Sequence, residues 1–169
     1  LFITSLQSEV HDLHKNNIKL NFIGELTKFS DTLRKSMKES ELLTYNNSGL
    51  TLNVALNYSG RWDIHQALLS IINEVQSKKI TIDEVNEKLI NSKLSLAENH
   101  EPDLFIRTGG EKRISNYLLW QLAYTEMYFT DILWPDFDID QFDLALDWFA
   151  KRQRRFGKTS AQIENDQNA

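Results

Sequence analysis

The sequence predicts an α/β fold with a mostly parallel central sheet that is flanked by helices. Short apolar segments, of the kind that form buried strands, alternate along the chain with longer segments of helical periodicity. This alternation favours parallel strands, because two parallel strands need a long crossover connection and that connection is usually a helix. The 169 residues are enough for one domain with a substantial core.

The first half of the chain shows this alternation most clearly. The segment LTLNVALN is the strongest strand candidate, because it is apolar with one polar interruption. Leu33, Met37 and Leu42 are spaced to share one face of a helix. Helices are predicted over residues 1–17, 29–45 and 62–75, strands over residues 18–23 and 50–57, and a turn over residues 46–49.

The second half is predicted to continue the same pattern with shorter elements. Thr81 and Glu84 form a capping box that opens a short helix through Leu89. Asp140 is predicted to cap a last helix that runs to about Arg155. Strands are predicted over residues 104–107 and 127–130, a helix over residues 116–124, and a disordered polar tail over residues 159–169.

Composition excludes several classes of protein. The formal net charge of −5 argues against general affinity for nucleic acid. The absence of cysteine excludes disulfides and thiolate metal sites, and it suits a cytoplasmic location. No apolar run approaches the roughly 18 residues of a membrane span. Neither GxGxxG nor GxxxxGK[ST] occurs, so the two usual nucleotide-binding fingerprints are missing.

Polar residues with the chemistry of an anion site follow two of the predicted strands: NYSGR at residues 57–61 follows LTLNVALN, and a second group follows the strand at residues 104–107. Ligands of open α/β sheets bind beyond the carboxyl ends of the strands. Arg107 ends one strand, two glycines allow a tight turn, and Arg113 and Ser115 follow where a helix is predicted to start. Guanidinium groups and helix N-termini both bind phosphate. The residues therefore predict a diphosphate cradle, although a surface loop of ion-paired arginines explains them equally well.

A family resemblance separates these two interpretations. The segment DLFIRTGGEKRISNYLLWQLAYTEMYFTDILWPDF, residues 103–137, resembles the C-terminal signature of cis-prenyltransferases, in particular the bacterial undecaprenyl diphosphate synthases. NYSGRWDI at residues 57–64 resembles a second signature, and IGELTKF at 23–29 and RRFG at 154–157 also fit. The resemblance is collinear from residue 1 to about residue 158. It identifies residues 1–158 as the C-terminal two-thirds of a single domain of this family.

The resemblance implies a prenyl transferase that condenses isopentenyl diphosphate repeatedly onto an allylic starter such as farnesyl diphosphate. The product would be a Z-polyprenyl diphosphate such as undecaprenyl diphosphate, the lipid carrier of cell-wall peptidoglycan synthesis. It further implies Mg²⁺ as cofactor, a homodimer, and delivery of the product to the membrane. The expected location is the cytoplasm, with peripheral contact at the inner face of the membrane as one option.

The resemblance also assigns roles to individual residues of this sequence. Arg107, Arg113 and Ser115 match positions that hold isopentenyl diphosphate, and Glu126 matches a carboxylate of the magnesium site. Arg155 and Gly157 match an R-x-G tail that reaches the diphosphate site of the partner subunit. Five apolar residues match positions along a hydrophobic tunnel between the sheet and the first helices, where the growing chain would lie: Leu1, Phe2, Ile18, Phe22 and Leu50.

Two segments of the family pattern do not occur in the 169 residues. The first resembles His-x-x-x-Asp-Gly-Asn and carries the magnesium-binding aspartate and the basic residues that hold the allylic diphosphate. The second ends in an Asn-Trp-x-Arg region. The first helix begins at Leu1 without a capping residue, which is expected of a chain cut within an element. Two hypotheses follow. The chain is part of a catalytic synthase and is inactive by itself, or it is a non-catalytic, diphosphate-binding accessory subunit of such an enzyme.

Overall fold

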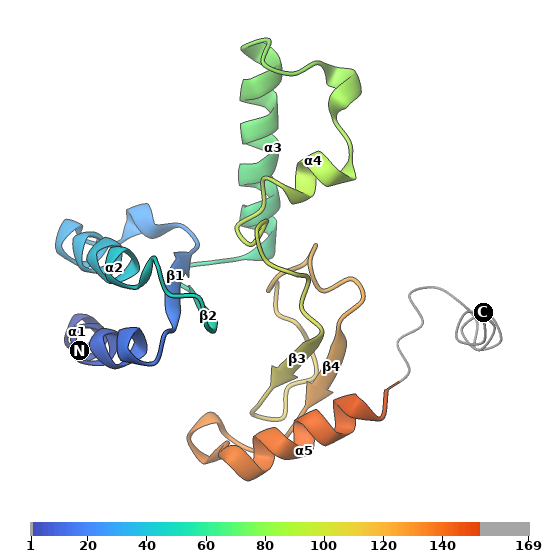
Figure 1. Cartoon of the computed structure of the whole chain (residues 1–169). Coiled ribbons are helices and arrows are strands. Elements are labelled where there is room, and N and C mark those ends of the chain that lie inside the picture. Colours follow the sequence, from blue (N-terminus) through green and yellow to red (C-terminus); the bar gives the residue numbers. More distant parts are fainter. Residues whose placement is uncertain (1, 153–169) are drawn as a thin grey trace. The chain divides into compact units, whose positions relative to one another are not determined.

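The computed structural model describes residues 2–152, which divide into an N-terminal unit up to Asn99 and a C-terminal unit from His100 (Figure 1). The N-terminal unit contains α1 (Phe2–Lys15), β1 (Lys19–Ile23), η1 (Leu26–Lys28), α2 (Asp31–Thr44), β2 (Thr51–Ala55), α3 (Gly60–Gln76), η2 (Ile82–Glu84) and α4 (Glu87–Asn91). The C-terminal unit contains β3 (Leu104–Arg107), β4 (Glu126–Phe129), η3 (Trp134–Asp136) and α5 (Ile139–Ala150).

Each unit is built on one pair of parallel strands, which confirms the prediction of a parallel α/β fold. In the N-terminal unit β1 pairs with β2, from Lys19 opposite Thr51 to Ile23 opposite Ala55. In the C-terminal unit β3 pairs with β4, from Leu104 opposite Glu126 to Arg107 opposite Phe129. Because the strands of a pair run in the same direction, both carboxyl ends of that pair lie at one edge.

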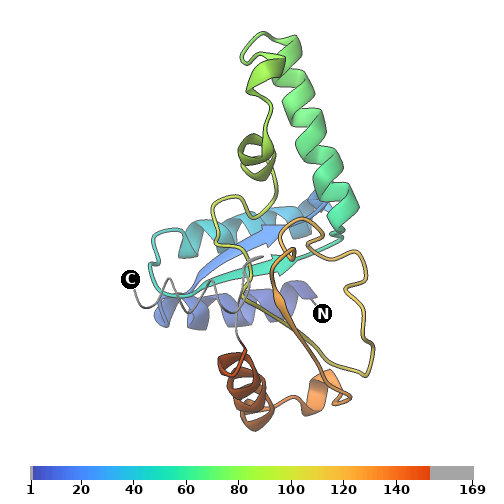
Figure 2. The ribbon, with the colours of Figure 1, turned by 90° about the vertical axis from the view of Figure 1, so that its right-hand side faces the viewer.

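The core of the N-terminal unit lies where α1, α2 and β1 meet (Figure 2). Val10 from α1, Leu20 and Phe22 from β1, and Met37 from α2 are all buried and form one cluster. The alternation of Leu20 and Phe22 along β1 places both side chains on the face that the helices cover. Of the three residues that the helical spacing placed on one face, Met37 is buried and Leu33 packs half-buried against the core, whereas Leu42 is 64% exposed. The spacing therefore predicted the buried face of α2 only in part.

Helix α2 also completes the hydrogen bonding of β1 on the side away from β2. The backbone N–H of Leu20 donates to the Thr44 hydroxyl at 3.0 Å, and that of Phe22 donates to the Glu41 carboxylate at 2.8 Å. Thr44 is fully buried. Side chains of a helix thus replace the strand that would otherwise pair with this edge.

The helix predicted over residues 116–124 does not form. Ser115, Asn116 and Leu118 have positive φ angles of 48°, 61° and 44°, which a right-handed helix cannot accommodate. Residues 116–124 fold into consecutive turns instead, and these turns bury Leu118 and Leu122. Tertiary burial outweighs the local helical preference here.

Two predicted helix boundaries are also corrected. Asp138, not Asp140, caps α5, because its carboxylate accepts from the backbone N–H of Gln141 at 3.0 Å. The capping box between Thr81 and Glu84 is present, but it opens only the short 3₁₀ helix η2. Asn86 then caps α4 as a separate helix.

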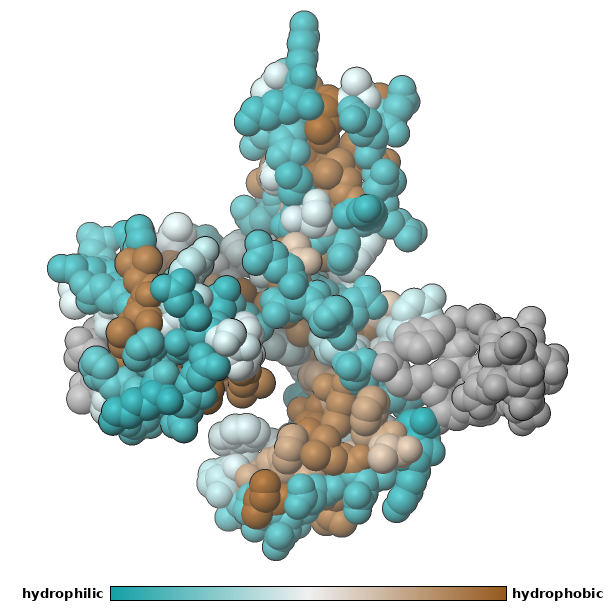
Figure 3. Space-filling model, in the orientation of Figure 1, coloured by the Kyte–Doolittle hydropathy of each residue, from teal (hydrophilic) through white to brown (hydrophobic). Residues whose placement is uncertain are grey.

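Apolar side chains remain on the surface over α3 and over α5 (Figure 3). Beside α3 they line an apolar cavity of about 260 Å³ that includes Leu68, Ile72 and Ile82. No helix among residues 2–152 is long and apolar enough to cross a membrane. The tail predicted over residues 159–169 lies outside the described residues.

Candidate functional site

The loop that follows β3 is fixed to the loop that follows β4. The N–H of Gly109 donates to the carbonyl of Ile132 at 2.8 Å, and the N–H of Gly110 donates to the carbonyl of Thr130 at 2.9 Å. Gly109 and Gly110 have φ angles of 83° and 78°, a conformation that favours glycine. The two glycines therefore let the backbone turn sharply at the carboxyl ends of both strands.

Arg107 organises the rest of this loop from the last position of β3. Its Nη1 group donates to the hydroxyl of Ser115 at 2.8 Å and also to the backbone carbonyl of Arg113. Both contacts use the same nitrogen. Among the described residues, no contact occupies Nη2 or Nε, so these two nitrogens can donate to a ligand. The three residues that the sequence predicted as a cradle are thus brought together by Arg107.

Arg113 forms an ion pair with Glu111 at the surface of the same loop. The two side chains are 61% and 51% exposed, so water screens their attraction. A diphosphate carries more negative charge than Glu111 and can accept two N–H groups from one guanidinium. The geometry therefore allows an anionic ligand to replace Glu111 as the partner of Arg113.

The helix start that was predicted to add its dipole to this site is absent. Ser115 and Asn116 lie in left-handed conformation where the first helical residues were expected. Tyr117 packs against Phe105 of β3, with ring centroids 6.4 Å apart, and burial raises the pKa of the Tyr117 hydroxyl. The positive charge of the site consequently comes from the two guanidinium groups, not from a helix N-terminus.

Glu126 lies at the other end of the strand pair. It is opposite Leu104 in the register, whereas Arg107 is opposite Phe129, so the two positions differ by three residues, or about 10 Å along the strands. The Glu126 carboxylate accepts from Nε of Arg152 at 3.0 Å. Within residues 2–152 no three His, Asp or Glu side chains gather as a metal site would require.

The predicted tunnel residues have different environments. Phe22 is buried in the core cluster, and Ile18 is half-buried. Leu50 is 66% exposed, just before β2. Leu1 lies outside the described residues, and the side chain of Phe2, at the start of α1, is not described either. Arg155 and Gly157 also lie outside the described residues.

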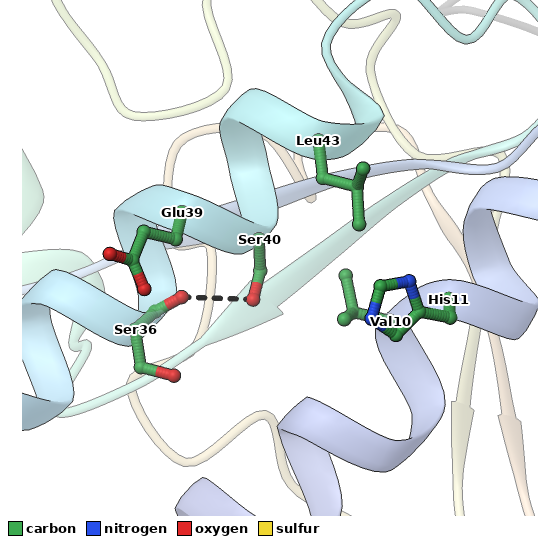
Figure 4. A pocket seen from close by; sticks show the side chains of 6 residues that line it. All are labelled: Val10, His11, Ser36, Glu39, Ser40 and Leu43. Carbon is green, nitrogen blue, oxygen red and sulfur yellow. Dashed lines mark hydrogen bonds between the residues drawn. The ribbon is translucent and has the colours of Figure 1, made fainter.

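A pocket of about 350 Å³ opens between α1 and α2 (Figure 4). It is lined by apolar and polar side chains. On its α2 side, the Ser40 hydroxyl donates to the backbone carbonyl of Ser36, one turn earlier in the helix, at 2.9 Å. Ile18, Phe22 and Leu50 are not among its described lining residues, which are Val10, His11, Ser36, Glu39, Ser40 and Leu43.

The sequence reasoning missed one buried carboxylate. Asp63, in the first turn of α3, is 2% exposed and accepts from the Tyr58 hydroxyl at 2.8 Å. It also accepts from the backbone N–H and the hydroxyl of Ser95, at 3.0 and 2.7 Å. Asp63 therefore joins the loop after β2 to the segment after α4. The sequence did offer one signal for Asp63: it is an acidic residue in the first turn of a helix, four positions after the capping residue Ser59.

Comparison with known proteins identifies the family. The family model described as putative undecaprenyl diphosphate synthase matches residues 1–157. The ditrans,polycis-undecaprenyl-diphosphate synthases of Yersinia pseudotuberculosis and Escherichia coli K12, both described as (2E,6E)-farnesyl-diphosphate specific, are 51% and 50% identical to this chain. They match 95% and 94% of it. The chain spans 64% and 63% of these two relatives.

Two solved structures are similar to the fold. Lavandulyl diphosphate synthase from Lavandula x intermedia, solved in complex with dimethylallyl diphosphate, has a TM-score of 0.89 and 33% identity. The match covers 93% of this chain and 68% of the synthase. A probable undecaprenyl diphosphate synthase from Campylobacter jejuni has a TM-score of 0.80 and 34% identity, and the match covers 92% and 70% of the two chains. The chain therefore belongs to the prenyltransferase family of putative undecaprenyl diphosphate synthases.

Proposed function

We propose that this chain supplies the isopentenyl diphosphate site of a cis-prenyltransferase that makes undecaprenyl diphosphate or a similar Z-polyprenyl diphosphate from farnesyl diphosphate. The observation that carries the proposal is the bridge from Arg107 to Ser115 and to the Arg113 carbonyl, at the carboxyl end of β3. Two guanidinium groups thereby lie on one fixed loop. The names of the relatives support farnesyl diphosphate as the second substrate.

The proposed role of this loop is positioning. Prenyl condensation forms a carbon–carbon bond between the isopentenyl double bond and the allylic carbon, while the allylic carbon–oxygen bond breaks and diphosphate leaves as an anion. A proton is then lost from C2 of the isopentenyl unit, which restores a double bond. A homoallylic diphosphate that is held still beside the allylic carbon reacts as an intramolecular partner, which lowers the entropic part of the barrier. Arg107 and Arg113 would bind its phosphate oxygens, and the Ser115 hydroxyl would add a donor after small rotation.

Mg²⁺, the cofactor that the family implies, does not fit the described residues by themselves. The carboxylate expected to bind it, Glu126, is paired with Arg152, and no further His, Asp or Glu completes a group around it within residues 2–152. We propose that the metal-binding aspartate belongs to the family segment resembling His-x-x-x-Asp-Gly-Asn, elsewhere in the whole protein. No catalytic step of residues 2–152 is assigned to the metal.

The remaining parts of the proposal concern the whole protein. It would be a cytoplasmic homodimer in which Arg155 and Gly157 of one subunit reach the allylic diphosphate bound to the other. Its product, which carries a long apolar chain, would pass to the membrane at the inner face and serve peptidoglycan synthesis.

Incubation of the full-length protein with farnesyl diphosphate, labelled isopentenyl diphosphate and Mg²⁺ tests the proposal. We expect labelled polyprenyl diphosphates, resolved by chain length, and no turnover by residues 1–169 alone. Saturable isopentenyl diphosphate binding without turnover by the full-length protein would instead support the accessory-subunit hypothesis. Absence of both binding and turnover would contradict the proposed function.

Replacing Leu50 with alanine tests the proposed tunnel. Leu50 is 66% exposed, so its truncation should leave no core cavity and should change the free energy of unfolding by less than about 0.5 kcal/mol. If Leu50 lines the closed end of the tunnel, the variant should make longer products than the wild type at an unchanged melting temperature. The product distribution on reversed-phase chromatography measures this. An unchanged distribution of product lengths would show that Leu50 does not line the tunnel.

A further inference from the structure

Ser36 carries a buried hydroxyl that has no hydrogen-bond partner among the described residues. Its residue is 6% exposed. Other buried polar side chains, those of Ser40, Thr44 and Asp63, all form hydrogen bonds. A buried hydroxyl without a partner costs free energy, and folded proteins seldom leave one without at least a bound water. The Ser36 hydroxyl is therefore a mark of a bound molecule.

This hydroxyl lies in the wall of the pocket between α1 and α2, where the side chains of Ser36 and Ser40 extend from α2 into the space between the two helices (Figure 4). Residues at spacings of three and four lie on one helix face, with Cβ atoms about 5–6 Å apart. The α2 residues of the lining follow this spacing: Ser36, Glu39, Ser40 and Leu43. Three neighbouring positions of one face thus bring oxygen atoms to the pocket.

The unused hydrogen-bonding capacity of the pocket is mainly that of acceptors. The Ser40 hydroxyl donates its proton to the Ser36 carbonyl, so toward a ligand its oxygen can only accept. The Glu39 carboxylate also accepts only, and its ion pair with Lys35 is long, at 3.8 Å, and exposed. The Ser36 hydroxyl can accept as well as donate. A ligand that matches these groups is a hydrogen-bond donor with a positive charge.

The rest of the lining is mostly apolar. Val10 from α1 is buried, and Leu43 from α2 is 37% exposed. Leu43 follows Glu39 by four residues, so about one helical turn, or 5.4 Å, separates the apolar part of the α2 lining from the polar part. A chain of roughly four to six carbons spans this length. The pocket, with a volume of about 350 Å³, is large enough for a ligand of that size.

We propose that the pocket between α1 and α2 binds the ammonium group of a small primary alkylamine. An ammonium has three donors and no acceptor, so it can donate to the Ser36 hydroxyl, the Ser40 hydroxyl and the Glu39 carboxylate. The alkyl chain packs against Val10 and Leu43. All of these residues belong to the N-terminal unit, whereas the diphosphate loop belongs to the C-terminal unit. The proposal does not depend on the proposed function.

Titration of the full-length protein with n-butylammonium, followed by saturation-transfer NMR, tests the proposal. We expect saturable binding with a Kd on the order of 1 mM, as for other ligands with few atoms. Ser36→Ala and Glu39→Gln should each weaken the binding about three- to tenfold, because each removes one hydrogen bond or charge. Glu9→Gln removes an exposed carboxylate of α1 that is not among the described lining residues. This matched control should leave the Kd unchanged.

n-Butanol, which has the same chain without the charge, separates recognition of the ammonium from burial of the chain. It should bind about fivefold more weakly or worse. Equal binding of n-butanol and n-butylammonium would overturn the proposal, and so would an unchanged Kd in both pocket variants. Absence of saturable binding up to about 50 mM would show that the pocket holds water only, which would also overturn it.

Thermal unfolding without ligand tests the state of the Ser36 hydroxyl. Ser36→Ala should leave the melting temperature unchanged or raise it by about 1–2 °C, because it removes a buried polar group that has no partner. Ser40→Ala breaks an existing hydrogen bond and should lower the melting temperature by about 1–3 °C. An equal fall for Ser36→Ala would show that its hydroxyl is already bonded within the whole protein, contrary to the proposal.

An ethanolamine lipid carries the same ammonium group as a free amine. Sedimentation with phosphatidylcholine vesicles, with and without phosphatidylethanolamine, distinguishes the two sources. We expect no sedimentation that depends on phosphatidylethanolamine. Sedimentation that requires this lipid and that Glu39→Gln abolishes would place the ammonium on a lipid headgroup, and would overturn the assignment to a small amine.

Discussion

Replacing Arg107 with alanine in the full-length protein should raise the KM for isopentenyl diphosphate by about ten- to a hundredfold. A hydrogen bond to a charged group is worth about 1.5–3 kcal/mol, and each 1.4 kcal/mol is a factor of ten in affinity. Arg107 is expected to bind the ligand directly, and it also holds Ser115 and the Arg113 carbonyl in place. The KM for the allylic diphosphate should change by much less, because the loop is proposed to bind only the isopentenyl substrate.

Two further variants make this result specific. Arg107→Lys keeps the charge but loses the planar set of donors, so it should recover only part of the affinity. Arg34→Ala removes an arginine from the surface of α2, where it pairs only with Asp31 among the described residues, and should leave both KM values unchanged. Equal increases in the KM of both substrates for Arg107→Ala would show that the residue does not belong to the isopentenyl diphosphate site.

Replacing Gly24 with alanine should destabilise the protein by about 4 kcal/mol or more, the range reached only by severe steric or packing defects. Gly24 follows β1 directly and has a φ angle of 115°, a conformation that residues with a side chain rarely adopt. A methyl group there would overlap the backbone carbonyl oxygen of Leu56 and lie 3.2 Å from Cβ of Tyr58. The backbone cannot move aside without separating β1 from β2, so chemical denaturation should show a large loss of stability.

Gly109→Ala is the matched control for the steric part of this effect. Gly109 also has a positive φ angle, 83°, but apart from its two chain neighbours no atom of residues 2–152 lies within 4 Å of the place where its Cβ would be. Its replacement should cost only the conformational penalty of about 1–2 kcal/mol. Similar losses of stability in both variants would mean that the conformation of Gly24, and not its contact with Leu56, limits the position.

The strands could be predicted from the sequence because each is marked by a local apolar run. The helices α1, α2 and α3 could be predicted because apolar residues recur along each of them at helical spacing. The turns over residues 116–124 could not, because the local pattern of Leu118 and Leu122 is also that of a helix. Their conformation accompanies the burial of Leu118 and Leu122 in the folded chain, which no local pattern encodes.

The candidate site likewise has a part that could be predicted from the sequence and a part that could not. Arg107, Arg113 and Ser115 lie within nine residues of one another, so a motif could identify them together. The contact between Glu126 and Arg152 spans 26 positions, and that between Asp63 and Ser95 spans 32. Contacts of this kind arise only when the chain folds back on itself, so no local pattern shows them. The family resemblance implies a metal role for Glu126, and the structure adds that its carboxylate pairs with Arg152.

The hydrogen bonds from β1 to Thr44 and Glu41 decide in which direction the N-terminal strand pair can be extended. Strand edges with free N–H groups are the usual template for adding another strand, from the same chain or from another molecule. On β1 the N–H groups of Leu20 and Phe22 are already used by α2. A further strand can therefore join this pair only beside β2, and β1 is protected from the edge-to-edge association by which parallel sheets aggregate.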